Sequence, residues 1–347
     1  MPAVRVLFLA DSHLGFDLPV RPRIERRRRG HDFLANYALA LEPALRGEVD
    51  LVIHGGDVFD MPAVDSALAY QAFEPLRRIA ERGIPVFIVP GNHERSRLPH
   101  LRFAAQPNIH IFDRARTFVV NVAGQRVALA GFPYERRNVR GRFAELLEAT
   151  GWQRQPADVR LLCVHHCVEG ATVGPQNYTF RSNHDVIRIR DIPAAFSALL
   201  SGHIHRHQVL TTDLRRRPVD VPVLYPGSIE RTAFAEMGEE KGYLVLQIDA
   251  GRTHWQFRRL PARPMMAETI SLSGLSPAGF EERVRALIAA APLDAVVAIR
   301  CEGDCSSAHA RVVAAARLRS YAPASMNVEV WLSEKRAEGV RPRLSIS

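Results

Sequence analysis

The chain has 347 residues, 47% of them hydrophobic and 24% charged, and its formal net charge is +9. Its length predicts two domains, and no apolar run approaches the roughly 18 residues of a membrane span, which argues against a membrane protein. The basic balance favours a polyanionic partner, above all nucleic acid. All basic residues except Lys241 and Lys335 are arginine, a bias that a GC-rich genome also produces.

The N-terminal residues MPAVRVLFLADSH are interpreted as a first strand and not as a signal peptide, because Asp11 follows the apolar run at once and no small-residue cleavage site is present. We therefore expect a cytoplasmic location. The cysteines form two C-x-x-x-C pairs, Cys163/Cys167 and Cys301/Cys305. Neither zinc ribbons nor redox motifs use this spacing, so we expect free thiols.

Three apolar, β-rich runs in the first part of the chain end in polar residues, at 4–10, 50–57 and 84–94. Helical patterns over 31–47 and 66–83 separate them, and Pro43 predicts a kink or an early end in the first helix. This strand–helix–strand alternation is typical of an α/β core with its functional site at the carboxyl ends of the strands.

Further strands are predicted at 117–124, 126–132, 159–166, 199–207, 221–228 and 241–249. Two of these runs are close-set, alternating and separated by turn residues, which predicts a second, more antiparallel sheet in the later part of the domain. Residues 255–265 predict a last strand and a linker. From residue 266 the pattern becomes a compact β-α-β-α-β unit with helices over 276–292 and 306–323. We therefore expect one domain at residues 1–262 and another at 263–347.

Five of the predicted strands end in side chains that commonly bind metals: Asp11 and His13, Asp57 and Asp60, Asn92 and His93, His165 and His166, and His203 and His205. Core strands need apolar residues, and buried unpaired carboxylates are unstable, so five such ends in succession are hard to obtain by chance. The segment SGHIHRHQVL (201–210) is interpreted as extended, which would turn alternate histidines to one side. A pair of divalent cations bound by these side chains would compensate for the burial of the carboxylates.

The order of these motifs, D-x-H, G-D-x-x-D, G-N-H-[DE], H and G-H-x-H, resembles that of the calcineurin-like metallophosphoesterases. Within this superfamily the chain is most similar to the SbcD-type DNA repair exonucleases, through DSHLG, GGDVFD, PGNHE and above all YPGSIERTAFAEMGEEKGY (225–243). The resemblance spans about residues 4–265. It implies a four-layer α/β fold, in which two mixed β-sheets are flanked by helices, with a small C-terminal α+β capping domain.

The resemblance also implies two metal ions bridged by Asp57. The other ligands would be Asp11, His13 and His205 at one ion, and Asn92, His165 and His203 at the second. His166 is the alternative to His165, because adjacent strand residues point to opposite faces. The mixed nitrogen and oxygen set suits Mn²⁺, Fe or Zn²⁺, and the family's usual activity argues for Mn²⁺.

By the same resemblance, His93 would lie beside the leaving oxygen as an acid or charge stabiliser, and Asp60 would hydrogen-bond and orient it. A turn or helix-capping role is the alternative for Asp60. Arg95 and Arg97 follow PGNHE directly and are expected to contact a nucleic-acid backbone. For His207 a substrate contact and a solvated position are equally favoured. The arginines at 26–29 either grip phosphates or form a solvated loop.

The leading hypothesis is a metal-dependent DNA exonuclease and endonuclease that hydrolyses phosphodiester bonds by a two-metal mechanism, in DNA repair or recombination. The resemblance further implies a homodimer and an SbcC-type ATPase partner, although little chain follows the small domain, where the family often keeps the helices that grip the ATPase.

One alternative is a phosphodiesterase or phosphatase acting on a small molecule or a phosphoprotein. Met61-Pro62 after Asp60 departs from the Arg-Gly of serine/threonine phosphatases. The other alternative, a non-catalytic DNA-binding protein on the same fold, is disfavoured by the intact set of ligands.

Overall fold

The structure is a computed structural model that describes residues 2–99, 105–249 and 251–332. The chain divides into two compact units, one with residues 1–20 and 29–262 and the other with residues 21–28 and 263–347. Residues 21–28, which the sequence division assigns to the first domain, therefore group with the second unit. Residues 333–347 of the expected second domain lie outside the described residues.

The first unit holds two six-stranded sheets within the described residues. In spatial order the first sheet contains β16 (Arg252–Arg259), β15 (Gly242–Asp249), β1 (Val4–Leu9), β2 (Leu51–His54), β3 (Val86–Ile88) and β4 (Ile109–Ile111). The strands β1 to β4 are parallel, and β15 and β16 extend the sheet in antiparallel pairing. The parallel part follows from the strand–helix–strand alternation of the sequence.

The second sheet contains, in spatial order, β13 (Gln208–Thr212), β14 (Pro218–Tyr225), β12 (Ala198–Ser201), β7 (Val159–Val164), β6 (Gln125–Gly131) and β5 (Arg116–Val122). Its three inner pairs are parallel and its two edge pairs are antiparallel. The first sheet also has three parallel and two antiparallel strand pairs, so the expectation of a more antiparallel second sheet is wrong. Strand β15, which was expected among the strands of the second sheet, pairs with β1 and β16 in the first sheet.

Strand β1 shows how the two sheets obtain a common core. Val6 and Phe8 pack in the apolar layer between the sheets, whereas Leu7 and Leu9 pack against the helices on the other side. Because successive side chains of a strand point to opposite faces, a strand buried on both faces is apolar throughout. The expected four-layer α/β architecture of two mixed sheets flanked by helices is confirmed.

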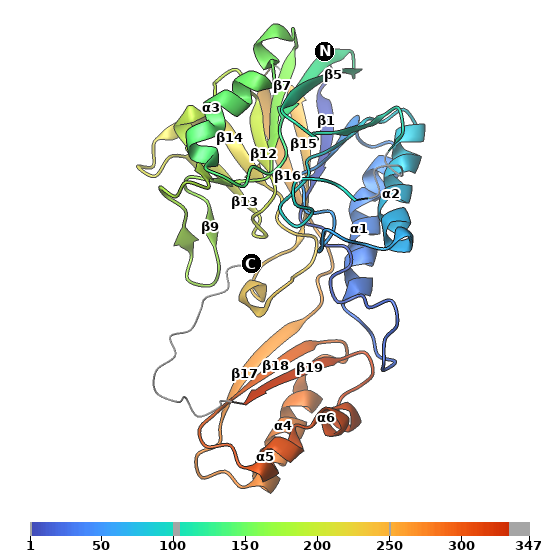
Figure 1. Cartoon of the computed structure of the whole chain (residues 1–347), viewed down its shortest axis with the longest axis vertical. Coiled ribbons are helices and arrows are strands. Elements are labelled where there is room, and N and C mark those ends of the chain that lie inside the picture. Colours follow the sequence, from blue (N-terminus) through green and yellow to red (C-terminus); the bar gives the residue numbers. More distant parts are fainter. Residues whose placement is uncertain (1, 100–104, 250, 333–347) are drawn as a thin grey trace. The chain divides into compact units, whose positions relative to one another are not determined.

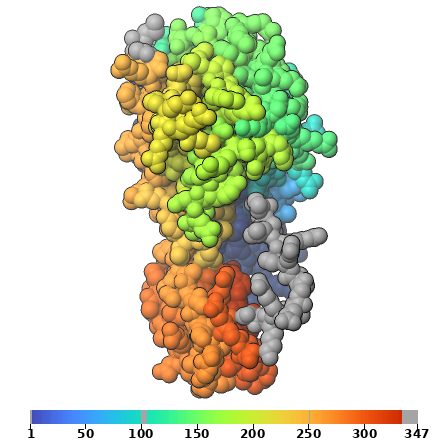
Figure 2. Space-filling model, turned by 90° about the vertical axis from the view of Figure 1, so that its left-hand side faces the viewer, coloured from blue at the N-terminus to red at the C-terminus, as the bar shows by residue number. Residues whose placement is uncertain are grey.

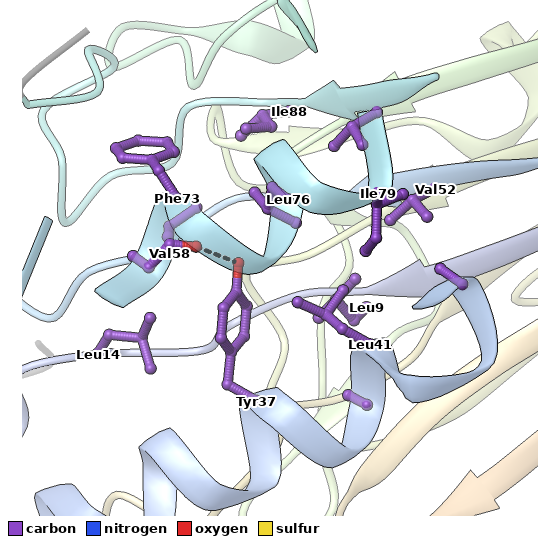
Figure 3. Packing of buried hydrophobic residues seen from close by; sticks show 14 of the residues in the cluster. Leu9, Leu14, Tyr37, Leu41, Val52, Val58, Phe73, Leu76, Ile79 and Ile88 are labelled. Atoms are coloured by element: carbon purple, nitrogen blue, oxygen red, sulfur yellow. Dashed lines mark hydrogen bonds between the residues drawn. The ribbon is translucent and has the colours of Figure 1, made fainter. Parts of the chain in front are cut away.

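Helices α1 (Gly30–Leu45) and α2 (Ser66–Glu81) cover the outer face of the first sheet, and α3 (Val139–Ala149) covers that of the second (Figure 1). Figure 3 shows Tyr37 of α1 packed among aliphatic side chains, with its hydroxyl donating a 3.1 Å hydrogen bond to the Ala72 carbonyl of α2. Pro43 lies inside α1, two residues before its end.

Shorter elements complete the first unit: β8 (Cys167–Val168), β9 (Thr172–Val173), β10 (Tyr178–Thr179), β11 (Val186–Ile187), and the 3₁₀ turns η2 (Trp152–Arg154), η3 (Ile189–Asp191) and η4 (Phe234–Glu236). The segment that carries β9 and β10 lies on the surface of this unit, where Tyr178 is exposed (Figure 2, yellow-green). Among the described residues, no helix is long and apolar enough to cross a bilayer.

The second unit is a three-stranded parallel sheet with helices between its strands. Its elements are β17 (Met265–Ser271), α4 (Pro277–Ala290), β18 (Val296–Glu302), α5 (Ser307–Val312), α6 (Ala315–Tyr321) and β19 (Asn327–Leu332). The single helix expected over 306–323 is two helices, separated at Val313 and Ala314.

Residues 21–28 are fixed to this small unit by two of the four consecutive arginines. Arg26 donates to the carbonyl of Ala322 at the end of α6 (2.9 Å), and Arg27 lies 3.6 Å from the carboxylate of Asp294. Carbonyls at a helix C-terminus lack partners within the helix, so a guanidinium there is stabilising. These two arginines therefore have a structural role.

Candidate metal centre

The candidate ligands come from loops at the carboxyl ends of five strands. Strands β1, β2 and β3 are adjacent in the first sheet, and β7 and β12 are adjacent and parallel in the second. Because the two sheets pack face to face, these five strand ends meet on one edge of the first unit.

Three overlapping groups of donor atoms form at this edge, with all donors of a group within 4.8 Å of one another. The groups are Asp11, His13 and His205, then His13, Asp57 and His93, and then Asp57, His165 and His203. Asn92 joins the third group, since its Oδ1 atom lies 3.0 Å from His165 Nε2 and 2.8 Å from His203 Nδ1. The residues expected to share each ion therefore lie together.

Four of these residues have a left-handed backbone conformation, with φ angles of 50° at Asp11, 42° at His13, 50° at Asp57 and 80° at His203. Residues other than glycine rarely adopt this conformation, and such strain is concentrated at functional sites, where the surrounding structure enforces it. The backbone strain in these loops is therefore associated with the positions of the four side chains at the centre.

Two glycines leave room for the ligands. A Cβ atom at Gly91 would collide with the Asp57 carboxylate, and one at Gly56 (φ 107°) with the His165 ring. Glycine is therefore required in GGD and PGN for close approach of the backbone to the centre.

The two central carboxylates each have one oxygen satisfied by the backbone. Asp11 Oδ1 accepts the N–H of His203 (3.0 Å), and Asp57 Oδ1 accepts the N–H of His93 (2.9 Å). The second oxygen of Asp11 is buried and has no hydrogen-bond partner among the described residues. The second oxygen of Asp57 lies 3.2 Å from His165 Nε2 and 4.0 Å from Nε2 of both His13 and His93.

The ring nitrogens have a matching arrangement. His165 Nδ1–H donates to the Gly55 carbonyl (2.7 Å), so its Nε2 atom faces the oxygens of Asp57 and Asn92. His13 Nε2 and His205 Nε2 are 2.9 Å apart. Acceptor atoms brought this close require a proton or a cation between them. The residues present thus fit a pair of divalent cations.

Burial and neighbouring charge set the protonation of this centre. Burial raises the pKa of Asp11, whereas for Asp57 the adjacent His165 outweighs burial and holds the pKa well below its usual range. Burial and the neighbouring His165 lower the pKa of His203 to about 3. A neutral imidazole is the form that binds metals, so His203 is ready for that role at neutral pH.

His165 and His166 point in different directions. The His166 side chain points away from the centre. Its Nε2 atom accepts the N–H of Glu135 (3.0 Å), and its ring stacks on Tyr134. Of the two alternatives, the structure brings His165 into the donor groups.

The contacts of His93 and Asp60 differ from the expectation. The carbonyl oxygen of Asp60, not its carboxylate, accepts the His93 Nδ1–H (2.7 Å). The carboxylate is 3.9 Å from His93 Nδ1 and 3.3 Å from His13 Nδ1. The Asp60 backbone carbonyl therefore orients His93. The Asp60 carboxylate lies closer to His13, in the loop after β1.

The histidines at 203, 205 and 207 do not lie in a strand. Residues 202–207 form a loop between β12 and β13, so the expected extended segment is wrong. His203 and His205 converge because of the turn at His203. The ring of His207 stacks on Phe257, with centroids 4.0 Å apart, and its Nδ1–H donates to the Tyr225 carbonyl. His207 belongs to none of the donor groups.

Arg95 and Arg97 are exposed and line an open hollow of about 460 Å³. The segment after β6 also lines this hollow, with Tyr134, Arg136 and Arg137 among its residues. The Tyr134 ring lies 5.6 Å from that of His203, which connects the hollow to the metal centre. This second segment was not among the predicted site residues, although its motif YERR combines an aromatic ring with two cations.

Three buried residues outside the predicted ligand set support the loops. His54 bridges the loops after β1 and β2, through Ser12 Oγ (2.8 Å) and the N–H of Gly56 (3.2 Å). Glu94 accepts the N–H groups of Phe59 and Gly91. Glu236 accepts the Nδ1–H of His205 (3.0 Å). The signal for Glu94 was its place in PGNHE; Glu236 had no comparable local signal.

A two-sheet α/β fold with histidine, aspartate and asparagine side chains gathered at one edge is the arrangement of a metallophosphoesterase. The model of the calcineurin-like phosphoesterase family matches residues 4–207, more than half of the chain. The chain belongs to this family. Membership implies a metal-dependent hydrolase, and the clustered donors fit divalent metal ions.

Among curated relatives, the uncharacterized metallophosphoesterase YhaO of Bacillus subtilis is 27% identical, over 63% of this chain and 50% of its own length. The DNA double-strand break repair protein Mre11 of Thermoplasma acidophilum is 23% identical, over 75% of this chain and 66% of its own. The chain thus spans about half to two thirds of these relatives. A dimetal phosphatase from Danio rerio aligns with 12% identity and a TM-score of 0.46, over 75% of this chain and 97% of that one.

Proposed function

We propose that this protein is a DNA nuclease that hydrolyses phosphodiester bonds at the centre formed by Asp11, His13, Asp57, Asn92, His165, His203 and His205. The observation that supports it best is the arginine-lined hollow beside the donor groups. Four arginines line this open hollow beside Asp113 and Glu135, and the resulting excess of positive charge suits a chain of phosphates better than a single small phosphoester. Relatives named as DNA double-strand break repair proteins support the same substrate.

A pair of divalent cations, Mn²⁺ in this proposal, supplies Lewis-acid charge neutralisation at the phosphate and lowers the pKa of water. Asp57, whose Oδ2 atom meets three imidazoles, would contribute to holding both ions. His93 has its Nδ1–H bound to the Asp60 carbonyl, so its Nε2 atom remains to give a proton to the leaving oxygen.

The arginines would position the substrate. Arg95 and Arg97, together with Arg136 and Arg137, contact successive phosphates, while Tyr134 offers a ring face to a base. The net charge of +9 favours association with DNA over long range. A homodimer, an SbcC-type ATPase partner and a cytoplasmic location remain part of this proposal.

The test uses purified chain with Mn²⁺ and end-labelled single- and double-stranded DNA, with bis(p-nitrophenyl) phosphate as a small phosphodiester. The wild type should release nucleotides or a ladder, and His93→Ala should lose about 10²–10⁴-fold in rate. Hydrolysis of the small phosphodiester without any DNA cleavage would contradict the DNA substrate and favour a small-molecule phosphodiesterase.

The hollow is tested by the double variant Arg136→Gln with Arg137→Gln. The control is Arg215→Gln with Arg252→Gln, which removes the same charge from exposed positions elsewhere. Each lost phosphate contact should lower the slope of log K against log salt by about 0.9, so the first variant should lose about 2 and the control little. Equal slopes in both variants would speak against the hollow as the DNA path.

A further inference from the structure

We propose that Glu236 and Lys241 are positioning residues for His205: together they fix the tautomer and orientation of its ring and thereby set the affinity of one of the two metal positions. This inference rests on the metal centre of the proposed function and not on DNA as its substrate.

Glu236 holds the ring of His205 from behind. Its Oε1 atom accepts the Nδ1–H of His205 (3.0 Å), while His205 Nε2 faces His13 Nε2 at the metal centre. A hydrogen bond to one ring nitrogen determines which nitrogen keeps a lone pair. Glu236 therefore selects the tautomer that presents Nε2 to a cation, and its charge makes that nitrogen a stronger donor.

Lys241 fixes both the carboxylate and the backbone of the same histidine. Its ammonium lies 2.7 Å from Glu236 Oε2 and donates to the His205 carbonyl (2.9 Å) and to Glu239 Oε2 (3.1 Å). The lysine is only 1% exposed. The His205 ring and backbone are thus attached to one buried ion pair, which leaves the ring little freedom to rotate.

The loop between Glu230 and Lys241 is built to hold this pair. Thr232 Oγ1–H donates to Glu236 Oε1 (2.7 Å), and the Arg231 guanidinium closes the loop by donating to the carbonyls of Glu236 (3.1 Å) and Glu239 (2.7 Å). These contacts show that Arg231 binds within the loop. Every partner of Glu236 restricts its carboxylate to the position that meets His205.

Stability alone does not account for such an arrangement. Burying a lysine and a glutamate carries a desolvation penalty that apolar side chains of similar volume would avoid. The ion pair has instead a directional consequence, because one oxygen of Glu236 binds Lys241 and the other binds the ring. Partners of this kind behind a metal-binding histidine change metal affinity by about 10–100-fold when removed.

The first measurement is a calorimetric titration of the metal-stripped full chain with Mn²⁺ alone. Relative to wild type, Glu236→Ala should weaken one of the two ions by about 10–100-fold and leave the other within about twofold. Glu236→Gln, which keeps an acceptor oxygen but loses the charge, should show a smaller loss. The control Glu240→Gln makes the same chemical change at an exposed position of the loop and should match wild type.

The second measurement reads the ring itself in the metal-free chain. Imidazole ¹⁵N shifts should show His205 as the Nδ1–H tautomer in wild type and Glu240→Gln, and as a mixture in Glu236→Ala. Glu236→Gln serves if the alanine variant does not fold. An unchanged tautomer with unchanged Mn²⁺ affinity, or an equal loss at both ions, would overturn the inference. Since no DNA is present, a negative nuclease assay would leave these results standing.

Discussion

Among single residues, Asp57 connects the loops that form the candidate metal centre. Its Oδ1 atom accepts the backbone N–H of His93 in the β3 loop. Its Oδ2 atom meets the ring of the same histidine and the rings of His13 and His165, which lie in the loops after β1 and β7. This geometry depends on Gly91, whose missing side chain leaves space for the carboxylate. The position of a ligand is therefore decided partly by a residue that binds nothing.

Gly91→Ala should displace the Asp57 carboxylate and weaken Mn²⁺ binding at both positions, because Asp57 belongs to two donor groups. Titration with Mn²⁺ measures the effect, and we expect a loss of at least tenfold at each ion. Gly238→Ala is the control, since a Cβ atom there meets no neighbour within 4 Å. Retention of wild-type affinity in Gly91→Ala would contradict the tight approach.

The sequence could predict which residues gather at the centre, because parallel strands in adjacent sheets deliver their carboxyl ends to one edge. The sequence could not predict which residues hold the ligands in place. Glu236 and His205 are 31 residues apart and Lys241 lies 36 residues from His205, so no local pattern connects them. Charged residues in a polar loop are indistinguishable, in sequence, from solvated ones.

At the scale of elements, the long helices and the central strands were predictable from their apolar periodicity, and the short ones were not. Helix α3 was missed because its eleven residues include Gly141 and three further polar or charged positions in the first two turns. The helix expected over 306–323 breaks after Val312, where a chain of alanine and valine gives no stop signal. The loop at 202–207 was mistaken for a strand because alternation also occurs in loops.

Helices α1 and α2 are joined by the hydrogen bond of Tyr37, and Tyr37→Phe tests its contribution. The variant keeps the ring in its apolar surroundings but loses the bond to the Ala72 carbonyl (Figure 3). We expect a loss of about 1 kcal/mol in the free energy of unfolding, measured by urea denaturation. A loss above about 3 kcal/mol would mean that the ring, and not the hydroxyl alone, had moved.

Strand packing also predicts the reactivity of the cysteines, all four of which are free thiols as expected. Cys163, Cys167 and Cys301 are buried, and burial raises the pKa of Cys301 to about 11. Since the thiolate is the reactive form, a raised pKa lowers reactivity at pH 8. Iodoacetamide should therefore label one thiol in the native chain, Cys305, and four after denaturation. Mass spectrometry counts the labels, and two or more in the native chain would contradict the packing.

For the whole molecule, removal of metal should reduce stability, because Asp11 and Asp57 are buried carboxylates and, in the part of the chain that the structure describes, histidines are the cationic side chains beside them. At Mn²⁺ concentrations a hundredfold above Kd, each ion should add about 2.7 kcal/mol. Two ions then correspond to a rise in Tm of about 10–20 °C.

Differential scanning calorimetry in EDTA and in Mn²⁺ measures this rise. Asp57→Asn provides the comparison and should lose most of it. A wild-type chain that melts at the same temperature in both conditions would show that the centre does not bind the ion.

During synthesis, residues 21–28 are made long before the residues that they contact in the second unit. Arg26 leaves the ribosome early, but the Ala322 carbonyl that it binds lies 296 residues later in the chain. At about 5–20 residues per second, the arginine-rich segment is without this partner for roughly 15–60 s. Throughout that interval the basic stretch RPRIERRRRG is made but lacks the contacts of Arg26 with Ala322 and of Arg27 with Asp294. Synthesis of the segment around Ala322 thus determines when Arg26 can form this hydrogen bond.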